Sequence, residues 1–216
     1  MNAISPLRAD DAEGVRQVLA IYQQAIEPSE QKPAALIAGH IADPRYLTMV
    51  SRDVASAVAG FALMAFLAGD RFWLLEYLAI REDQRAHGAG AALFNAAAAA
   101  AQRRAPGALC VLEVDQPDAP KTAGNDPVRR LKFYRNLGCR KIGGLSYLLP
   151  LDHAGAPPPM QLLIHGRADE TALAHEDASD IVRALYTEVY AQAGDDPRIA
   201  AMLAPSAGRA FALEPL

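Results

Sequence analysis

The chain has 216 residues, of which 51% are hydrophobic and 21% are charged, and its formal net charge is −4. A chain of this length and composition buries a sizeable core and forms an ordinary globular protein. Because a net charge of this sign gives no general attraction to polyanions, we expect neither nucleic acid nor an anionic membrane as a partner.

The first third of the chain begins with a short strand and two helices. Residues 4–10 predict the strand, and Asp10 or Asp11 can cap a helix that ends before Pro28. Its apolar positions have the three/four spacing of a helix: Val15, Val18, Leu19 and Tyr22. A second short helix is expected after Pro33.

The pattern then changes to strands. Residues 46–51, 57–67 and 72–80 are rich in branched and aromatic side chains and are separated by short turns. This order predicts an antiparallel meander.

Helices and strands alternate in the next part of the chain. Residues 88–104 predict a helix, and residues 109–114 a strand that we expect to pair in parallel with an earlier one. Asp126 as cap and Pro127 at the first helical position then start a helix, which Gly138 ends.

The last part predicts two more strands, at residues 141–149 and 160–165, and a final amphipathic helix at residues 178–191. The tail after Gly194 shows little pattern. Together the elements predict an α+β (mixed α/β) fold rather than a doubly wound sheet.

Two cysteines, Cys110 and Cys139, are too few for a disulfide framework and lack the CxxC spacing of a metal site. We therefore expect reduced thiols, no metal and a cytoplasmic protein. No signal peptide is visible, and the longest apolar stretch, residues 54–68, is shorter than the about 20 residues that span a membrane.

The segment 85–91 joins a strand to a helix and contains Gly88 and Gly90. Glycines let a ligand approach the backbone, and the free N–H groups at a helix start attract phosphate. An ordinary tight corner is one alternative. A dinucleotide site is another, but the third glycine of its motif is absent.

Two motifs resemble those of the GCN5-related N-acetyltransferases (GNAT). Leu78-Ala79-Ile80 followed by Arg85-x-x-Gly88-x-Gly90 resembles the family's acyl-CoA motif. Residues 130–139, which contain Phe133-Tyr134, resemble its second motif, with Cys139 in place of the last aromatic residue.

The resemblance implies a central, mostly antiparallel sheet splayed between its fourth and fifth strands and flanked by helices. It also implies an acyltransferase domain over residues 1–168, with a C-terminal helix and tail, residues 169–216, packed on it. The expected co-substrate is acetyl-CoA, and the expected reaction is direct transfer of its acyl group to an amine of a small molecule, peptide or protein.

The resemblance assigns the coenzyme to the strand end and the glycine loop. Backbone groups of the strand end would pair with pantetheine, and those of the loop would hold the pyrophosphate. The family often has Asn at the start of the later helix, where Asn125 is the nearest candidate. The expected coenzyme-binding residues are Leu78, Ala79, Ile80, Arg85, Ala86, His87, Gly88, Ala89, Gly90, Ala91 and Asn125.

Glu76 is the candidate general base, because it interrupts an otherwise apolar strand four residues before Ile80. Apolar neighbours on the same face predict a raised carboxyl pKa, which suits a base near neutral pH. The alternatives are a Glu at an exposed edge or one that only orients the substrate.

Tyr134 is the candidate acid, because the resemblance places its hydroxyl near the thioester sulfur; a core aromatic residue is the alternative. The basic run around it, Arg129, Arg130, Lys132 and Arg135, is either a solvated face or a contact for CoA phosphates. Glu113 and Asp115 can line an acceptor pocket for a cation.

Fold alone does not fix function, so a non-catalytic acyl-CoA binding or sensing domain stays open as a second interpretation. The acceptor amine has no motif in this sequence, and the expected state is a monomer or a homodimer.

Overall fold

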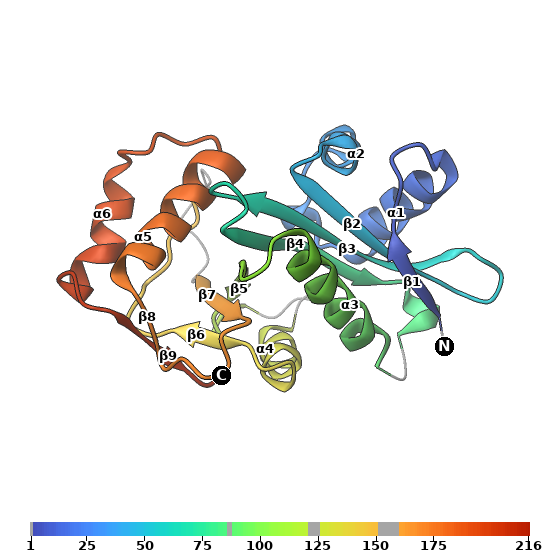
Figure 1. Cartoon of the computed structure of the whole chain (residues 1–216). Coiled ribbons are helices and arrows are strands. Elements are labelled where there is room, and N and C mark those ends of the chain that lie inside the picture. Colours follow the sequence, from blue (N-terminus) through green and yellow to red (C-terminus); the bar gives the residue numbers. More distant parts are fainter. Residues whose placement is uncertain (1, 86–87, 121–125, 151–159) are drawn as a thin grey trace. The chain divides into compact units, whose positions relative to one another are not determined.

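The computed structural model describes residues 2–85, 88–120, 126–150 and 160–216 (Figure 1). They form two compact units. The N-terminal unit comprises Met1–Phe66 and Trp73–Ala108, and the C-terminal unit comprises Leu67–Phe72 and Leu109–Leu216.

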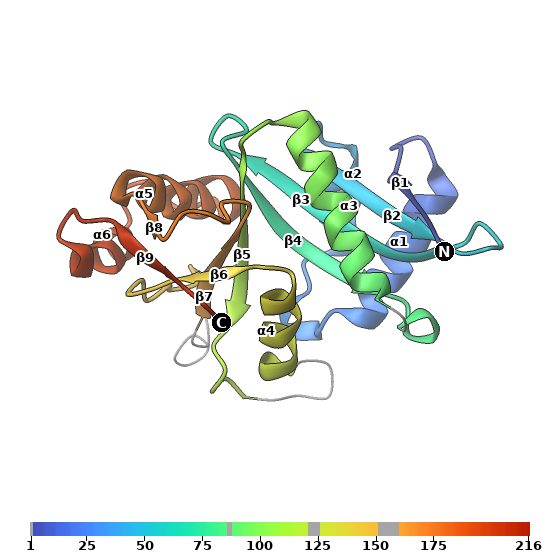
Figure 2. The ribbon, with the colours of Figure 1, turned by 60° about the horizontal axis from the view of Figure 1, so that its bottom comes forward.

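The N-terminal unit is a four-stranded sheet covered by three helices. The strands follow the order β1 (Ala3–Pro6), β2 (Tyr46–Arg52), β3 (Val58–Leu67), β4 (Phe72–Ile80). The helices are α1 (Ala12–Ala25), α2 (Ala34–Ala42) and α3 (Ala89–Arg104), with short 3₁₀ turns at η1 (Pro28–Glu30) and η2 (Glu82–Gln84). In Figure 2, α3 crosses in front of β2–β4 and α1 lies behind them. Helices on both faces explain why every residue of β3 is buried.

Gly60 in β3 allows a close approach of β4. A Cβ at this position would lie 2.4 Å from Ile80 Cδ1 and 2.7 Å from the carbonyl oxygen of Ala79. Any larger residue would therefore displace the end of β4. The backbone N–H of Arg81 donates to the carbonyl of Ala59 at 2.8 Å, which fixes this end further.

The C-terminal unit has a second set of strands, in the order β5 (Leu109–Asp115), β7 (Met160–His165), β6 (Arg140–Ile142), β9 (Phe211–Glu214), β8 (Ala172–Leu173). Each neighbouring pair is antiparallel. The helices are α4 (Pro127–Asn136), α5 (His175–Ala184) with its π-helical extension η3 (Leu185–Val189), and α6 (Pro197–Leu203), which η4 (Ala204–Ser206) follows.

The predicted strand 141–149 was wrong in its length. β6 ends at Ile142, because Gly143 and Gly144 follow and Gly144 has a φ of +76°. A side chain at Gly143 would meet Glu214 of the neighbouring strand. Among the described residues, an isolated bridge between Tyr147 and Met160 follows β6.

The predicted last helix, 178–191, begins earlier, at His175, and is not the last element. The tail contains α6 and β9, and β9 pairs with β6. Asp196 caps α6 by accepting the N–H of Arg198, and Pro197 takes the first helical position. This is the signal that predicted α4, so the sequence contained it.

The mixed α/β fold with a mostly antiparallel sheet is confirmed. Residues 169–216 belong to the same compact unit as β5–β7. The splay between the fourth and fifth strands, their parallel pairing and the division at residue 168 stay predictions.

Candidate active site

The start of α3 presents backbone N–H groups that the helix itself leaves without an acceptor. Gly88 precedes the helix with a φ of +78°, a conformation that favours glycine. The first helical hydrogen bond runs from the N–H of Ala92 to the carbonyl of Gly88 at 2.9 Å. The N–H groups of Ala89, Gly90 and Ala91 therefore lack an acceptor within the helix.

No side chain of the described residues caps this start, and the first turn carries no acidic residue. Three N–H groups and the positive end of the helix dipole therefore point at one place, an arrangement that binds phosphate. The half-buried Ala89 and Ala91 leave room for a ligand to reach the backbone.

The end of β4 leads into this loop. Leu78 and Ile80 are half-buried and Ala79 is buried. Arg85 folds back on the strand, where its Nε donates to the carbonyl of Ile80 at 3.0 Å. A pyrophosphate contact by Arg85 stays a prediction. Ala86, His87 and Asn125 lie outside the described residues.

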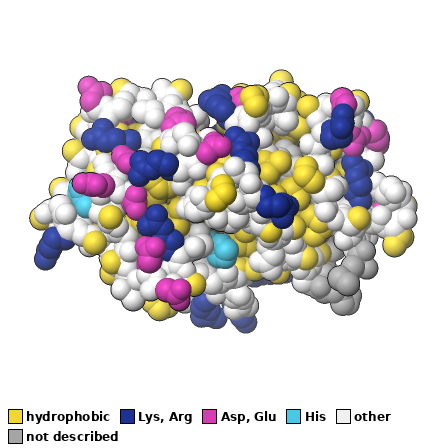
Figure 3. Space-filling model, viewed as in Figure 1, with side chains coloured by type: hydrophobic (Ala, Val, Ile, Leu, Met, Phe, Trp, Pro, Cys, Tyr) yellow, Lys and Arg dark blue, Asp and Glu magenta, His cyan; other side chains and the backbone are white. Residues whose placement is uncertain are grey.

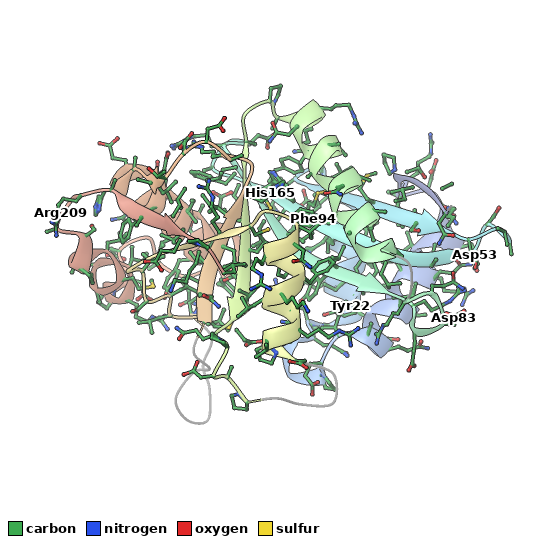
Figure 4. The ribbon with its side chains drawn as sticks, turned by 90° about the horizontal axis from the view of Figure 1, so that it is seen from below. Tyr22, Asp53, Asp83, Phe94, His165 and Arg209 are labelled. Carbon is green, nitrogen blue, oxygen red and sulfur yellow. The ribbon has the colours of Figure 1, made fainter. Side chains whose placement is uncertain are left out.

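Arg81 fastens the connection between β4 and α3. Its guanidinium bonds Asp53 at 3.0 Å and Asp83 at 2.6 Å, the two carboxylates that Figure 4 labels. Asp53 belongs to the hairpin between β2 and β3, so the strand end is tied to its neighbouring hairpin.

Glu76 lies in the middle of β4, and its side chain is only 6% exposed. Lys32 Nζ, from the segment before α2, lies 2.5 Å from its Oε1. His40 Nδ1, from α2, lies 3.5 Å from its Oε2. Neither Oε2 nor Nδ1 has a hydrogen-bond partner within the described part of the chain.

The predicted raised pKa of Glu76 was wrong. Burial is the largest influence and raises the pKa, but the adjacent His40 and the positive charge of Lys32 together lower it below the ordinary 4.5. The apolar neighbours along β4 are read from the local sequence. The two partners come from residues 44 and 36 positions earlier in the chain.

Tyr46 fixes the orientation of the His40 ring. The two rings stack with centroids 4.2 Å apart, and the Tyr46 hydroxyl lies 3.3 Å from His40 Nε2. Burial and the charge of Glu76 raise the pKa of Tyr46, so its hydroxyl stays protonated. The contact with Tyr46 at Nε2 turns the other ring nitrogen, Nδ1, toward Glu76 Oε2.

Comparison with known proteins places this site in a family. The profile of the acetyltransferase (GNAT) family matches residues 13–142, more than half of the chain. The chain belongs to the GNAT acetyltransferase family. No curated protein sequence matches it.

Solved structures of GNAT proteins share the fold. A GNAT-family acetyltransferase of Bacteroides thetaiotaomicron is 20% identical with a TM-score of 0.65, covering 87% of this chain and 98% of its own. The ribosomal-protein-S18-alanine N-acetyltransferase of Escherichia coli is 19% identical with a TM-score of 0.57, covering 76% and 92%. An aminoglycoside 6'-N-acetyltransferase complexed with coenzyme A is 17% identical with a TM-score of 0.60, covering 76% and 96%.

The second GNAT motif lies on α4 in the C-terminal unit. Asp126 caps this helix by accepting the N–H of Arg129 at 3.2 Å, as predicted. Tyr134 is half-buried, and its ring meets that of Phe133 edge-on with centroids 5.2 Å apart. Gly138 has the expected positive φ, +79°. The acid role of Tyr134 stays a prediction.

The two carboxylates expected to receive a cation have partners in the chain. Glu113 accepts hydrogen bonds from the hydroxyls of Tyr147 and Tyr190, the latter at 2.8 Å. Asp115 pairs with Arg130 at 3.4 Å. Sequence reasoning missed both tyrosines, which no spacing links to Glu113. Part of the basic run on α4 thus neutralises a carboxylate of its own unit.

Charged side chains of both signs lie interspersed on the face of the molecule drawn in Figure 3. Across the described ranges, no three His, Cys, Asp or Glu residues are grouped as a metal site, and no helix has the length and apolarity of a membrane span.

Proposed function

We propose that this protein is an acyl-CoA-dependent N-acyltransferase that transfers the acyl group, acetyl in the first place, directly to an amine of a small molecule, peptide or protein. The observation that carries the proposal is the open start of α3, which follows β4 and the turn η2 along the sequence, in a chain of the GNAT family.

The open N–H groups of Ala89, Gly90 and Ala91 would hold the pyrophosphate of the co-substrate. The backbone of Leu78 and Ile80 would pair with pantetheine and lead the thioester along β4. The similar fold of an enzyme solved with coenzyme A agrees with this assignment.

Glu76 would accept the proton of the acceptor amine, directly or through water, and Tyr134 would protonate the leaving thiolate. A covalent cysteine intermediate is disfavoured, because burial raises the pKa of Cys139 to about 12 and that of Cys110 well above its ordinary value. Such thiols stay protonated and are poor nucleophiles, which supports direct transfer.

The test combines purified protein, acetyl-CoA and a panel of amines, with release of free thiol as the signal. We expect thiol release that depends on an amine and falls in Tyr134→Phe. Calorimetry that finds no CoA binding would overturn the proposal.

A second function, a non-catalytic acyl-CoA sensor, is favoured by one observation. Glu76 is buried and faces two groups of its own chain, so no acceptor amine reaches it as the site stands. Tight CoA binding without turnover of any amine, and slow thioester hydrolysis unchanged in Tyr134→Phe, would support the sensor instead.

A further inference from the structure

A primary amine of the protein already lies at the candidate base. Lys32 Nζ is 2.5 Å from Glu76 Oε1, within hydrogen-bond distance of the group that would accept a proton during acyl transfer. A nucleophile in contact with a base is the arrangement that covalent chemistry requires.

Lys32 is held in this place by the backbone around it. Its N–H donates to the Tyr22 hydroxyl at 2.6 Å, and the Tyr77 hydroxyl donates to the carbonyl of Glu30 at 3.1 Å. Tyr22 and Tyr77 pack edge-on, with ring centroids 5.0 Å apart. The amine is therefore positioned rather than free in solvent, while its side chain stays 24% exposed and reachable.

The same strand carries the expected thioester path. Glu76 and Leu78 lie two residues apart on one face of β4, a separation of about 7 Å. Lys32 and the expected acyl path therefore belong to one compact unit.

We propose that Lys32 Nζ is a self-acylation site, at which the protein transfers the acyl group of an acyl-CoA to its own side chain. This inference rests on the proposed function, because it needs a bound acyl-CoA thioester. Lys32 would act as a tethered acceptor, placed where the ammonium group of an external amine would otherwise bind.

Acyl transfer to Lys32 removes two protons from its ammonium group. One proton of the Lys32 ammonium leaves along its hydrogen bond to Glu76 and passes on to water, since the lowered carboxyl pKa keeps Glu76 ionised. The neutral amine then attacks the thioester carbonyl, forming a C–N bond. The C–S bond then breaks, and coenzyme A leaves as a thiolate that takes up a proton. The attacking nitrogen loses its second proton, so one acyl-CoA yields one amide, one free thiol and one released proton.

The product would change the site. An acylated Lys32 is neutral, so Glu76 would lose the cation at its Oε1 while His40 stays near its Oε2. Self-acylation would thereby remove the ion pair between Lys32 and Glu76.

The experiment follows the mass of the whole protein during incubation with acetyl-CoA and maps the modified peptides. The chain has four lysines, at positions 32, 121, 132 and 141, so the other three measure background acylation in the same sample. We expect Lys32 to be acetylated at least about tenfold faster than the others, since it is held beside a base. The rate per molecule should not depend on protein concentration.

Two variants test the assignment. Glu76→Gln keeps the side-chain size and should reduce Lys32 acetylation to the background rate. Lys32→Arg keeps the cation beside Glu76 and should remove the fast modification at position 32, leaving only the background on the other three lysines. It gives a result even where Glu76→Gln fails to fold.

Acetylation of Lys32 no faster than that of the other lysines overturns the self-acylation, and so does a rate per molecule proportional to protein concentration. Thiol release with added amines is measured separately. Turnover of amines without modification of Lys32 would thus refute this inference and leave the proposed function standing.

Discussion

The start of α3 and the carboxylate of Glu76 belong to the same compact unit and differ in what satisfies their polar groups. The helix start leaves three backbone N–H groups without an acceptor in the helix. Glu76 is buried, with Lys32 against one oxygen and His40 near the other.

The expected coenzyme site at the start of α3 can therefore accept a ligand as it stands, whereas the expected base, Glu76, is already paired within the chain. N–H groups without an acceptor at a helix start lower the stability of the protein, and a bound anion restores it. A carboxylate already paired gives stability now, and an external amine must displace its partner to reach it.

The largest expected effect comes from removing the cation that is paired with Glu76. Lys32→Met leaves the Glu76 carboxylate buried without its cation, which should lower the free energy of unfolding by about 2 kcal/mol. Urea denaturation of the variant and the parent measures this difference.

The double variant Lys32→Met with Glu76→Leu is the control, because it replaces both charges by apolar groups of similar size. It should recover most of the loss. Equal stability of Lys32→Met and the parent would mean that the ion pair contributes nothing.

The second effect comes from placing a negative charge at the start of α3. Ala89→Glu places a carboxylate beside the N–H groups at the start of α3, where it repels a pyrophosphate but interacts favourably with the helix dipole. We expect the Kd for CoA, measured by calorimetry, to rise about tenfold, equivalent to about 1.4 kcal/mol, without loss of thermal stability.

Ala99→Glu makes the same change at an exposed position in the middle of α3. It should leave the Kd unchanged. A similar Kd for the two variants would show that pyrophosphate does not bind at the helix start.

A smaller effect is expected from alanine at two glycines with positive φ, and it distinguishes a loss of stability from a loss of CoA binding. Gly88 and Gly107 both have a φ near +80°, and nothing lies within 4 Å of a Cβ at either position. Gly88→Ala and Gly107→Ala should each lower the free energy of unfolding by about 1 kcal/mol. Only Gly88→Ala should also weaken CoA binding, because Gly107 follows the other end of α3. Loss of affinity in both variants would argue for a global effect.

The smallest effect is a pH dependence of the stability that ionised Glu76 contributes. The pKa of Glu76 lies below 4.5 in the folded protein, so ionisation of its carboxyl group stabilises the fold. This contribution is complete above pH 4.5 and is lost as the pH falls through the folded pKa. Relative to Glu76→Gln, the parent should lose stability on acidification below pH 4.5. A constant difference between the two proteins from pH 3 to 7 would contradict the lowered pKa.

Most elements of the N-terminal unit could be predicted because their signals are local. β4 has the predicted bounds, and α3 starts one residue after the predicted position, with Gly88 outside it. The errors lie in the C-terminal unit. The glycine pair 143–144 ends β6 early, and α6 starts at Asp196-Pro197 in a tail for which no helix is predicted.

The sequence by itself determined the helix start after Gly88 that forms the expected coenzyme site. A glycine with positive φ, small residues after it and a strand before it are all found within a short segment, so local sequence predicts an anion site there. Only the tertiary structure decided the state of Glu76. Its partners Lys32 and His40 come from distant segments, and whether a buried carboxylate has a high or a low pKa depends on which charges the fold brings to it.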